Sequence, residues 1–180
     1  MSRRAWPIIV AVFVAACLIH VGISLRGALR SAADRNATRR CAQNVHALAR
    51  ALRLYIAEND DTLPPADRWV SRLQPYLRGR EVFSCPAARD HHGSYAYNAG
   101  LSGLRLSTIK QPGRVVAIFE TEADGNPSGG AELLPATPRH WGGDMIARPD
   151  GGIRWVDRKH GPPGLGGAPT WLKEYEREHF

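Results

Sequence analysis

Residues 5–25 read AWPIIVAVFVAACLIHVGISL, and this stretch decides the fold that the rest of the chain can adopt. It holds 21 residues without a formal charge. An α-helix of that length is about 30 Å long, which matches the hydrocarbon core of a bilayer. A helix also satisfies its own backbone hydrogen bonds, which lipid cannot do. Residues 1–25 are therefore predicted to be a single membrane anchor, with Trp6 at the interface between lipid and water.

Two alternatives to the uncleaved anchor stay open. The charged residues 1–4 (MSRR) before an apolar run resemble the start of a cleaved signal peptide, although this run is longer than a signal peptide needs. Residues 14–17 (VAAC) resemble the lipobox of a lipoprotein, in which Cys17 is lipidated and becomes the new N-terminus. The chain remains mostly apolar from Cys17 to Ile23, whereas lipoproteins usually turn polar at that point. We therefore expect the anchor, with lipidation of Cys17 as the alternative.

The net charge of +7 is concentrated around the apolar segment. Residues 1–40 carry seven arginines and one acid, which leaves +1 for the rest of the chain. Arginines beside an apolar helix are attracted to anionic lipid head groups, so membrane lipid is an expected partner. The nearly neutral remainder argues against nucleic acid as a partner. Because arginines flank the apolar segment on both sides, charge alone does not give the membrane orientation.

Residues 26–60 are predicted to continue the anchor as an amphipathic spine helix. Residues 24–59 contain no proline and are rich in good helix formers. Asn59-Asp60-Asp61 and the prolines at 64 and 65 end the pattern. One apolar stripe follows the helical spacing of three and four residues: Cys41, Val45, Leu48, Leu52 and Tyr55.

Residues 61–160 are predicted to form an α+β head. Residues 69–76 suggest a short helix that breaks near Pro75, and residues 94–98 and 114–120 have strand patterns. Residues 145–148 and 153–156 predict a β-hairpin, with the Asp150-Gly151 pair as its turn. A loop and a short helix are expected for residues 161–180. The expected fold class is α+β, with a long N-terminal helix packed on a small antiparallel sheet.

The order of short motifs from about residue 38 to 157 resembles one known family. These are the type II secretion pseudopilin-like proteins with a C-terminal "His, nine residues, Asp-Gly" motif, the prepilin-like proteins of planctomycete-type bacteria. His140, Asp150 and Gly151 have this spacing. The matching segments are CAQNV (41–45), LPP (63–65), FSCP (83–86), SYAYN (94–98), IKQP (109–112), RHWGG (139–143) and IRWV (153–156).

The resemblance implies a pilin-like fold and a structural or assembly role in a type II secretion or pilus-like system or the cell envelope. It implies a single-pass inner-membrane protein with an extracytoplasmic head, and pseudopilin-like or secretion-system subunits as partners. The chain departs from the family in lacking the Gly before the cleavage point and the Glu near the start of the apolar run. It also has Gly152 where the family often has His.

The resemblance, through export, also implies a disulfide between Cys41 and Cys85; the alternative is two buried free thiols. His140, Asp150 and Gly151 are expected to be a structural motif, in which His140 caps or braces the hairpin. A metal bound by His140, Asp144 and Asp150 is the weaker alternative. Glu120 and Glu122 are expected to be solvated at a strand end.

We expect no enzyme activity and no cofactor, because the sequence has no nucleophile elbow, P-loop, dinucleotide fingerprint or CxxC pair. The adjacent His91 and His92 are a poor chelate. Two other functions remain as alternatives. One is an envelope binding module or lipoprotein that recognises a sugar or peptide in a pocket near Trp141 and Trp155. The other is a hydrolase with a site around His140, Asp144 and Asp150.

Overall fold

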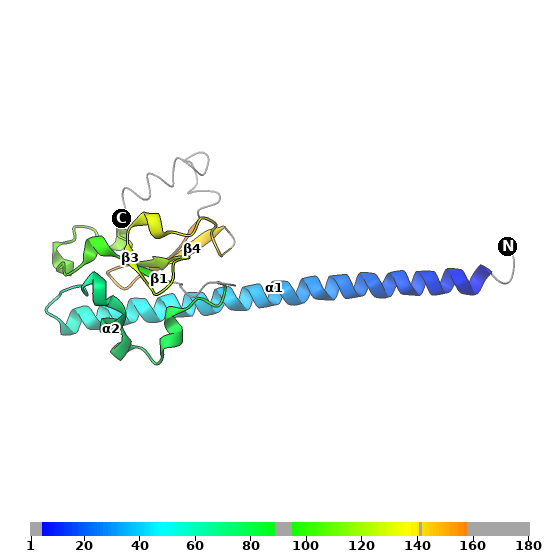
Figure 1. Cartoon of the computed structure of the whole chain (residues 1–180), viewed down its shortest axis with the longest axis horizontal. Helices are drawn as coiled ribbons and strands as arrows, with labels where there is room; N and C mark the ends of the chain where they lie inside the picture. The colour runs from blue at the N-terminus through cyan, green and yellow to red at the C-terminus, as the bar shows by residue number, and fades with distance from the viewer. Residues whose placement is uncertain (1–4, 89–94, 141, 158–180) are drawn as a thin grey trace. The chain divides into compact units, whose positions relative to one another are not determined.

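The computed structural model describes residues 5–88, 95–140 and 142–157 (Figure 1). The predictions for Ser94, His91, His92, Trp141 and residues 161–180 fall outside these ranges. The chain divides into two compact units, Met1–Asn36 and Ala37–Phe180, which are described separately below. Besides two α-helices and five strands, short 3₁₀ turns span Ala66–Arg68, Gln74–Tyr76, Arg80–Phe83, Ala99–Leu101, Leu106–Thr108, Pro112–Arg114 and Ala131–Leu133.

Helix α1, Ala5–Glu58, contains both the predicted anchor and the predicted spine. Its large apolar side chains from Trp6 to Leu29 are exposed. The helix is long and apolar enough to cross a membrane, a property that a signal sequence near an N-terminus shares. The helix stops at Glu58, since Asp60 and Asp61 have φ values of 50° and 61°, in the left-handed region that ends helices.

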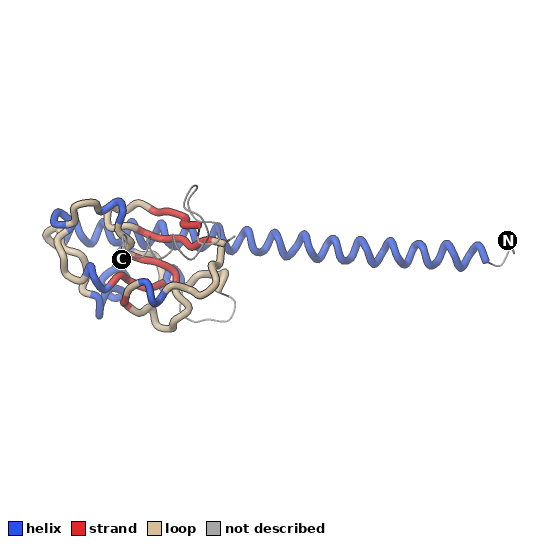
Figure 2. The backbone as a smooth tube through the Cα atoms, turned by 90° about the horizontal axis from the view of Figure 1, so that it is seen from above, coloured by secondary structure: helices blue, strands red, loops and turns tan. Residues whose placement is uncertain are grey.

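Residues 37–58 of α1 form the spine of the second unit. The predicted stripe is confirmed, because Cys41, Val45, Leu48 and Leu52 are fully buried and Tyr55 is 8% exposed. The stripe packs against the sheet and against α2, Trp69–Leu73, in one core cluster. As predicted, α2 breaks near Pro75 and continues as the 3₁₀ turn Gln74–Tyr76. In Figure 2 the strands cross over this part of α1.

The sheet has five strands in the order β3-β1-β2-β4-β5. Every neighbouring pair is antiparallel except β1 with β3, so the sheet is mostly antiparallel, as predicted, with one parallel pair that the sequence did not indicate. The turn at Gly125–Pro127 brings the chain back beside β1 in the parallel direction. The strands are β1 (Tyr95–Asn98), β2 (Ile118–Glu120), β3 (Ser128–Gly129), β4 (Gly143–Ala147) and β5 (Ile153–Asp157).

Strand β2 is shorter than the predicted 114–120. Pro112 begins a 3₁₀ turn through Arg114, which delays the extended conformation. Alternating side chains of the sheet then divide between two clusters. Tyr95, Tyr97 and Ile118 face α1. The opposite face holds a smaller cluster, to which Leu133 and Leu134 also pack: Ala96, Val116, Phe119, Ile146 and Val156.

Candidate functional site

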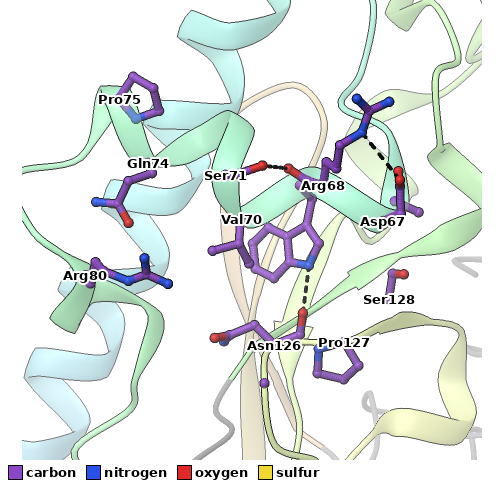
Figure 3. A pocket seen from close by; sticks show the side chains of 13 residues that line it. Asp67, Arg68, Val70, Ser71, Gln74, Pro75, Arg80, Asn126, Pro127 and Ser128 are labelled. Atoms are coloured by element: carbon purple, nitrogen blue, oxygen red, sulfur yellow. Dashed lines mark hydrogen bonds and ion pairs between the residues drawn. The ribbon is translucent and has the colours of Figure 1, made fainter.

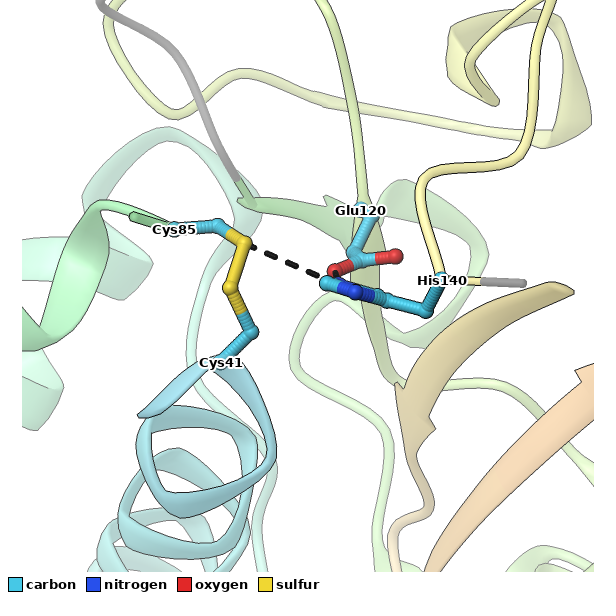
Figure 4. Close-up of side chains that lie close together, drawn as sticks. All are labelled: Cys41, Cys85, Glu120 and His140. Carbon is cyan, nitrogen blue, oxygen red and sulfur yellow. Dashed lines mark hydrogen bonds and ion pairs between the residues drawn. A yellow bond between two sulfur atoms is a disulfide. The ribbon is translucent and has the colours of Figure 1, made fainter. Parts of the chain in front are cut away.

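The imidazole of His140 is fully buried between the sheet and α1. Its Nε2–H donates to Glu120 Oε1 at 2.7 Å, and the Thr38 hydroxyl of α1 lies 3.1 Å from Nδ1. Figure 4 shows the ring pointing at the disulfide, with Cys85 Sγ 3.7 Å from Nε2. Both ring nitrogens are therefore engaged, and one of these contacts reaches the spine helix.

Glu120 is also fully buried, so the prediction that it is solvated was wrong; Glu122 is exposed, as expected. Because Glu120 follows Ile118 by two residues on β2, both point to the face that α1 covers. Its Oε2 accepts the Met145 N–H at 3.2 Å. Burial, and secondarily the Glu120 charge, raise the pKa of the neighbouring Tyr95 phenol well above its ordinary value.

Cys41 and Cys85 form the predicted disulfide, which joins α1 to the segment after the 3₁₀ turn Arg80–Phe83. Both cysteines are buried, whereas Cys17 is a free, exposed cysteine in the apolar part of α1. The disulfide, His140 and Glu120 therefore share one enclosed site. Each of these four residues is at most 3% exposed.

The backbone of His140 lies at the start of the hairpin. His140 and Gly143 exchange two backbone hydrogen bonds, and the Trp155 indole N–H donates to His140 O at 2.9 Å. A Cβ at Gly143 would lie 2.3 Å from Val156 O and 2.5 Å from the Trp155 ring. Glycine is therefore required at 143, where the Trp155 ring lies against the backbone, although Trp155 itself is 38% exposed.

The other end of the motif is the turn between β4 and β5. Gly151 N–H donates to Arg148 O at 3.0 Å, and Arg148 N–H donates to Gly152 O at 2.9 Å. Only Gly151 of the Asp-Gly pair has positive φ, +84°. The turn is thus a three-residue loop closed by a glycine bulge, rather than a two-residue turn in which both central residues have positive φ.

This turn is held to α1 by Arg53. Its Nη1 donates to Asp150 O at 2.7 Å, and a Cβ on Gly151 would lie 2.5 Å from Arg53 Cγ. Gly151 is needed for two reasons, its φ and the close passage of the arginine stem. Sequence reasoning missed Arg53, because nothing in the local pattern of a charged helix residue indicates a partner 97 positions away.

The two ends of the motif therefore contact α1 at two levels. We call the pairs His140–Thr38 and Asp150–Arg53 the two-point clamp. The helix residues are 15 positions apart, or about 22 Å along an α-helix. Strand β4 between the two ends is only Gly143–Ala147, because His140 and Gly143 face each other and exchange backbone hydrogen bonds. The hairpin and the histidine that precedes it thus each supply one contact to α1.

His140, Asp144 and Asp150, the alternative metal ligands, do not form one metal-capable group among the described residues. Asp150 Oδ1 accepts the Gly152 N–H at 2.8 Å and lies 3.5 Å from Arg148 Nε, so its carboxylate serves its own turn. Asp144 is buried on β4. Among the described residues, the one group of metal-capable side chains contains His140 but neither aspartate; its other members are Cys41, Cys85 and Glu120.

A groove of about 610 Å³ lies beside α2 and is lined by none of the clamp residues (Figure 3). It is lined by residues 66–71, Gln74, Pro75, Arg80 and 125–128. The Trp69 indole N–H donates to Asn126 O at 2.9 Å across it. The pocket expected for a binding module was placed at Trp141 and Trp155, and Trp155 is not among the lining residues.

Comparison with family models, with characterised proteins and with solved structures finds no match to this chain.

Proposed function

We propose that this chain is a membrane-anchored, pseudopilin-like structural protein of a secretion or pilus-like assembly or of the cell envelope. Helix α1 anchors it in the inner membrane, and the α+β unit stands on the extracytoplasmic side and presents a surface to partner subunits. The role is mechanical and non-catalytic. The observation that carries the proposal is the division of one helix, α1, into an exposed apolar part and a part buried under a sheet.

The exposed part needs a partner that the described chain does not provide. Side chains such as Phe13, Leu18 and Ile23 are each more than 60% exposed. Transfer of such side chains out of water stabilises each by about 1.5–3 kcal/mol, so water is a poor environment for this stretch. Lipid, or the apolar helices of neighbouring subunits within lipid, supplies that environment.

The buried part supports a mechanical role. Residues 38–53 of α1 are tied to the rest of the second unit, which we call the sheet unit, by one covalent and two polar connections. These are the disulfide and the two contacts of the two-point clamp. A force on the helix is thereby transmitted to the sheet at two levels. The family-typical residues are used in these connections, which supports the pilin-like assignment over the hydrolase alternative.

The proposed anchor is tested by membrane extraction and by the mass of the mature chain. The full-length chain, expressed in a Gram-negative bacterium, should stay in membranes after an alkaline carbonate wash and have the uncleaved mass of 19.8 kDa. A variant that lacks residues 5–25 is the control and should be released by the wash. A shortened chain in the soluble fraction would indicate a signal peptide. An acylated chain that begins at Cys17 would indicate the lipoprotein alternative, and either outcome would overturn the proposed anchor.

Assembly and sidedness are tested in the same membranes. Cys17 lies in the apolar part of α1 and is a built-in probe for helix association. Mild oxidation should trap Cys17-linked dimers or complexes with other subunits, and Cys17→Ala should abolish them. Protease added outside spheroplasts should degrade the sheet unit. A monomer under all oxidation conditions, or a protected sheet unit, would contradict the assembly role or the orientation.

A further inference from the structure

Four potential metal ligands meet in the buried centre of the sheet unit. One ligand atom from each of Cys41, Cys85, Glu120 and His140 lies within 4.8 Å of all the others (Figure 4). All four residues are buried. In the disulfide form the two sulfur atoms bond to each other. Once the disulfide is reduced, the same positions present two thiols, an imidazole and a carboxylate to one central point.

We propose that reduction of the Cys41–Cys85 disulfide converts this cluster into a tetrahedral Zn²⁺ site with Cys41, Cys85, Glu120 and His140 as ligands. Thiolate, imidazole and carboxylate are the ligands of protein zinc sites, and four-coordinate sites that exclude water have a structural role. Two sulfur ligands disfavour Ca²⁺ and Mg²⁺, which take oxygen ligands. This proposal does not depend on the membrane role and stands or falls separately.

The oxygen and nitrogen ligands are already oriented. The Thr38 hydroxyl next to His140 Nδ1 holds the ring so that Nε2 faces the sulfur atoms. The Met145 N–H holds the Glu120 carboxylate through Oε2, which leaves Oε1 on the side of the ring. Such outer contacts on a histidine and a carboxylate orient metal ligands in zinc proteins. Neither contact uses the disulfide, so both persist after its reduction.

The sulfur atoms need only a small rearrangement. At Zn–S distances of about 2.3 Å, tetrahedral geometry places two sulfur ligands roughly 3.8 Å apart. The Cα atoms of Cys41 and Cys85 are 5.0 Å apart, close enough that rotation of the side chains can supply this separation. Zn²⁺ then takes the place of the Nε2–H as the group that joins His140 to Glu120.

The charge balance also suits a dication. Two thiolates and one carboxylate carry three negative charges, of which Zn²⁺ offsets two. The Arg139 guanidinium donates to the carbonyl oxygen of Thr121, the residue after Glu120, and from there it offsets part of the remainder. Its Nη1 is buried and has no hydrogen-bond partner among the described residues. Buried positive and negative charge in the same region therefore complement each other.

The redox step is balanced as follows. A dithiol or phosphine reductant passes two electrons to the S–S bond, which breaks, and water or the dithiol supplies two protons to the thiols. Zn²⁺ binding then releases the two thiol protons to solvent, and His140 binds through Nε2 as a neutral imidazole with its proton on Nδ1, beside the Thr38 hydroxyl. A disulfide-exchange oxidant reverses the process, reforms the S–S bond and expels Zn²⁺. Residues 41 and 85 are thus joined in both conditions, by the disulfide in oxidising surroundings and by the shared Zn²⁺ in reducing surroundings.

Co²⁺ is the probe for the test, because tetrahedral thiolate-bound Co²⁺ is coloured and Zn²⁺ displaces it. The full chain in detergent micelles carries Cys17→Ala, so that the remaining cysteines are those of the site. After reduction with a phosphine under mild urea and removal of the urea, the chain should bind one Co²⁺. It should then show thiolate charge-transfer and tetrahedral ligand-field absorption, which Zn²⁺ abolishes. The oxidised chain should show neither band.

Glu120→Gln tests the fourth ligand, and Glu122→Gln is the matched control two residues along. Loss of an outer-shell partner weakens metal binding by roughly 10–100-fold, and loss of the Glu120 ligand should weaken Co²⁺ binding at least as much. Glu122→Gln should leave the affinity unchanged. Cys85→Ser should abolish the charge-transfer band. The proposal is overturned if the reduced chain binds no Co²⁺, if the bands are those of octahedral Co²⁺, or if Glu120→Gln binds like the unsubstituted chain.

Discussion

Replacement of His140 by alanine removes the imidazole that pairs with a buried carboxylate. The Glu120 carboxylate would keep the Met145 N–H at 3.2 Å but lose its 2.7 Å partner, in a place without solvent access. Breaking a buried ion pair by removal of one partner costs about 3–5 kcal/mol. Because small domains are stable by only about 5–15 kcal/mol, we expect His140→Ala to remove a fifth or more of the free energy of unfolding.

The stranded charge can be separated from the lost packing by a double-mutant cycle. Glu120→Gln alone should cost about 1.5–3 kcal/mol, the value of a hydrogen bond to a charged group. In the His140→Ala background, the same substitution should instead recover about 1–3 kcal/mol, since no ionised group is then left unpaired. The sign of the Glu120→Gln effect thus reverses between the two backgrounds.

Urea unfolding of the full chain in detergent micelles, followed by near-ultraviolet circular dichroism, measures these free energies. Glu122→Gln, an exposed carboxylate near the same strand end, is the control and should change stability by less than about 0.5 kcal/mol. The reasoning fails if His140→Ala lies within about 1 kcal/mol of the unsubstituted chain. It also fails if Glu120→Gln destabilises both backgrounds equally.

Three further predictions use the same unfolding measurement. Gly151→Ala should cost about 2 kcal/mol more than Gly125→Ala, because both have positive φ but only the first Cβ meets an arginine stem of α1; equal costs would refute the steric argument. Joint replacement of Cys41 and Cys85 by alanine should cost about 4 kcal/mol, from a sequence separation of 44 residues, and a loss below 1 kcal/mol would contradict this. Burial raises the pKa of the Tyr95 phenol. The stability that the neutral phenol contributes should therefore be fully present below the unfolded pKa of 10.0 and be lost as the pH rises above it. Tyr95→Phe should reduce this loss in a series of unfolding measurements from about pH 7 to 11.

The helical stripe was predictable because its cause is local. The spacing of Cys41, Val45 and Leu48 follows from 3.6 residues per turn, and each of these residues is buried as the pattern requires. The break at Pro75 and the hairpin around Gly151 are likewise local, since they depend on a missing N–H and on positive φ. These features could be read without knowledge of any neighbour in space.

The sheet topology was less predictable. Strand β3 is two residues long, too short for a propensity pattern, and its parallel pairing with β1 depends on where the turn at Asn126 delivers the chain. Asn126 adopts φ 55° and its side chain donates to Phe83 O and Tyr95 O. These two hydrogen bonds join Asn126 to residues that are 43 and 31 positions away in the sequence. They decide the arrangement, and the local sequence contains no sign of them.

The burial of Glu120 in the candidate site could not be predicted from the local sequence either. Alternation along β2 places it on the face of Ile118, but whether that face is covered at position 120 depends on α1. A carboxylate at a strand end is normally solvated, and the sequence alone favoured that state. Only the presence of His140, which arrives 20 residues later in the chain, makes the buried position tolerable.

The sequence by itself determined the apolar segment, the spine stripe and the hairpin, whereas the pairing of Cys41 with Cys85 was only implied by the family resemblance. The first three depend on composition, periodicity and backbone preference, which are properties of short stretches. Only the tertiary structure decided that His140 and Asp150 each reach α1 and that the metal-capable group is Cys41, Cys85, Glu120 and His140. The physical reason is that burial and electrostatic pairing are set by what lies across space, and in this fold one helix and one hairpin, some 100 residues apart, supply the two sides.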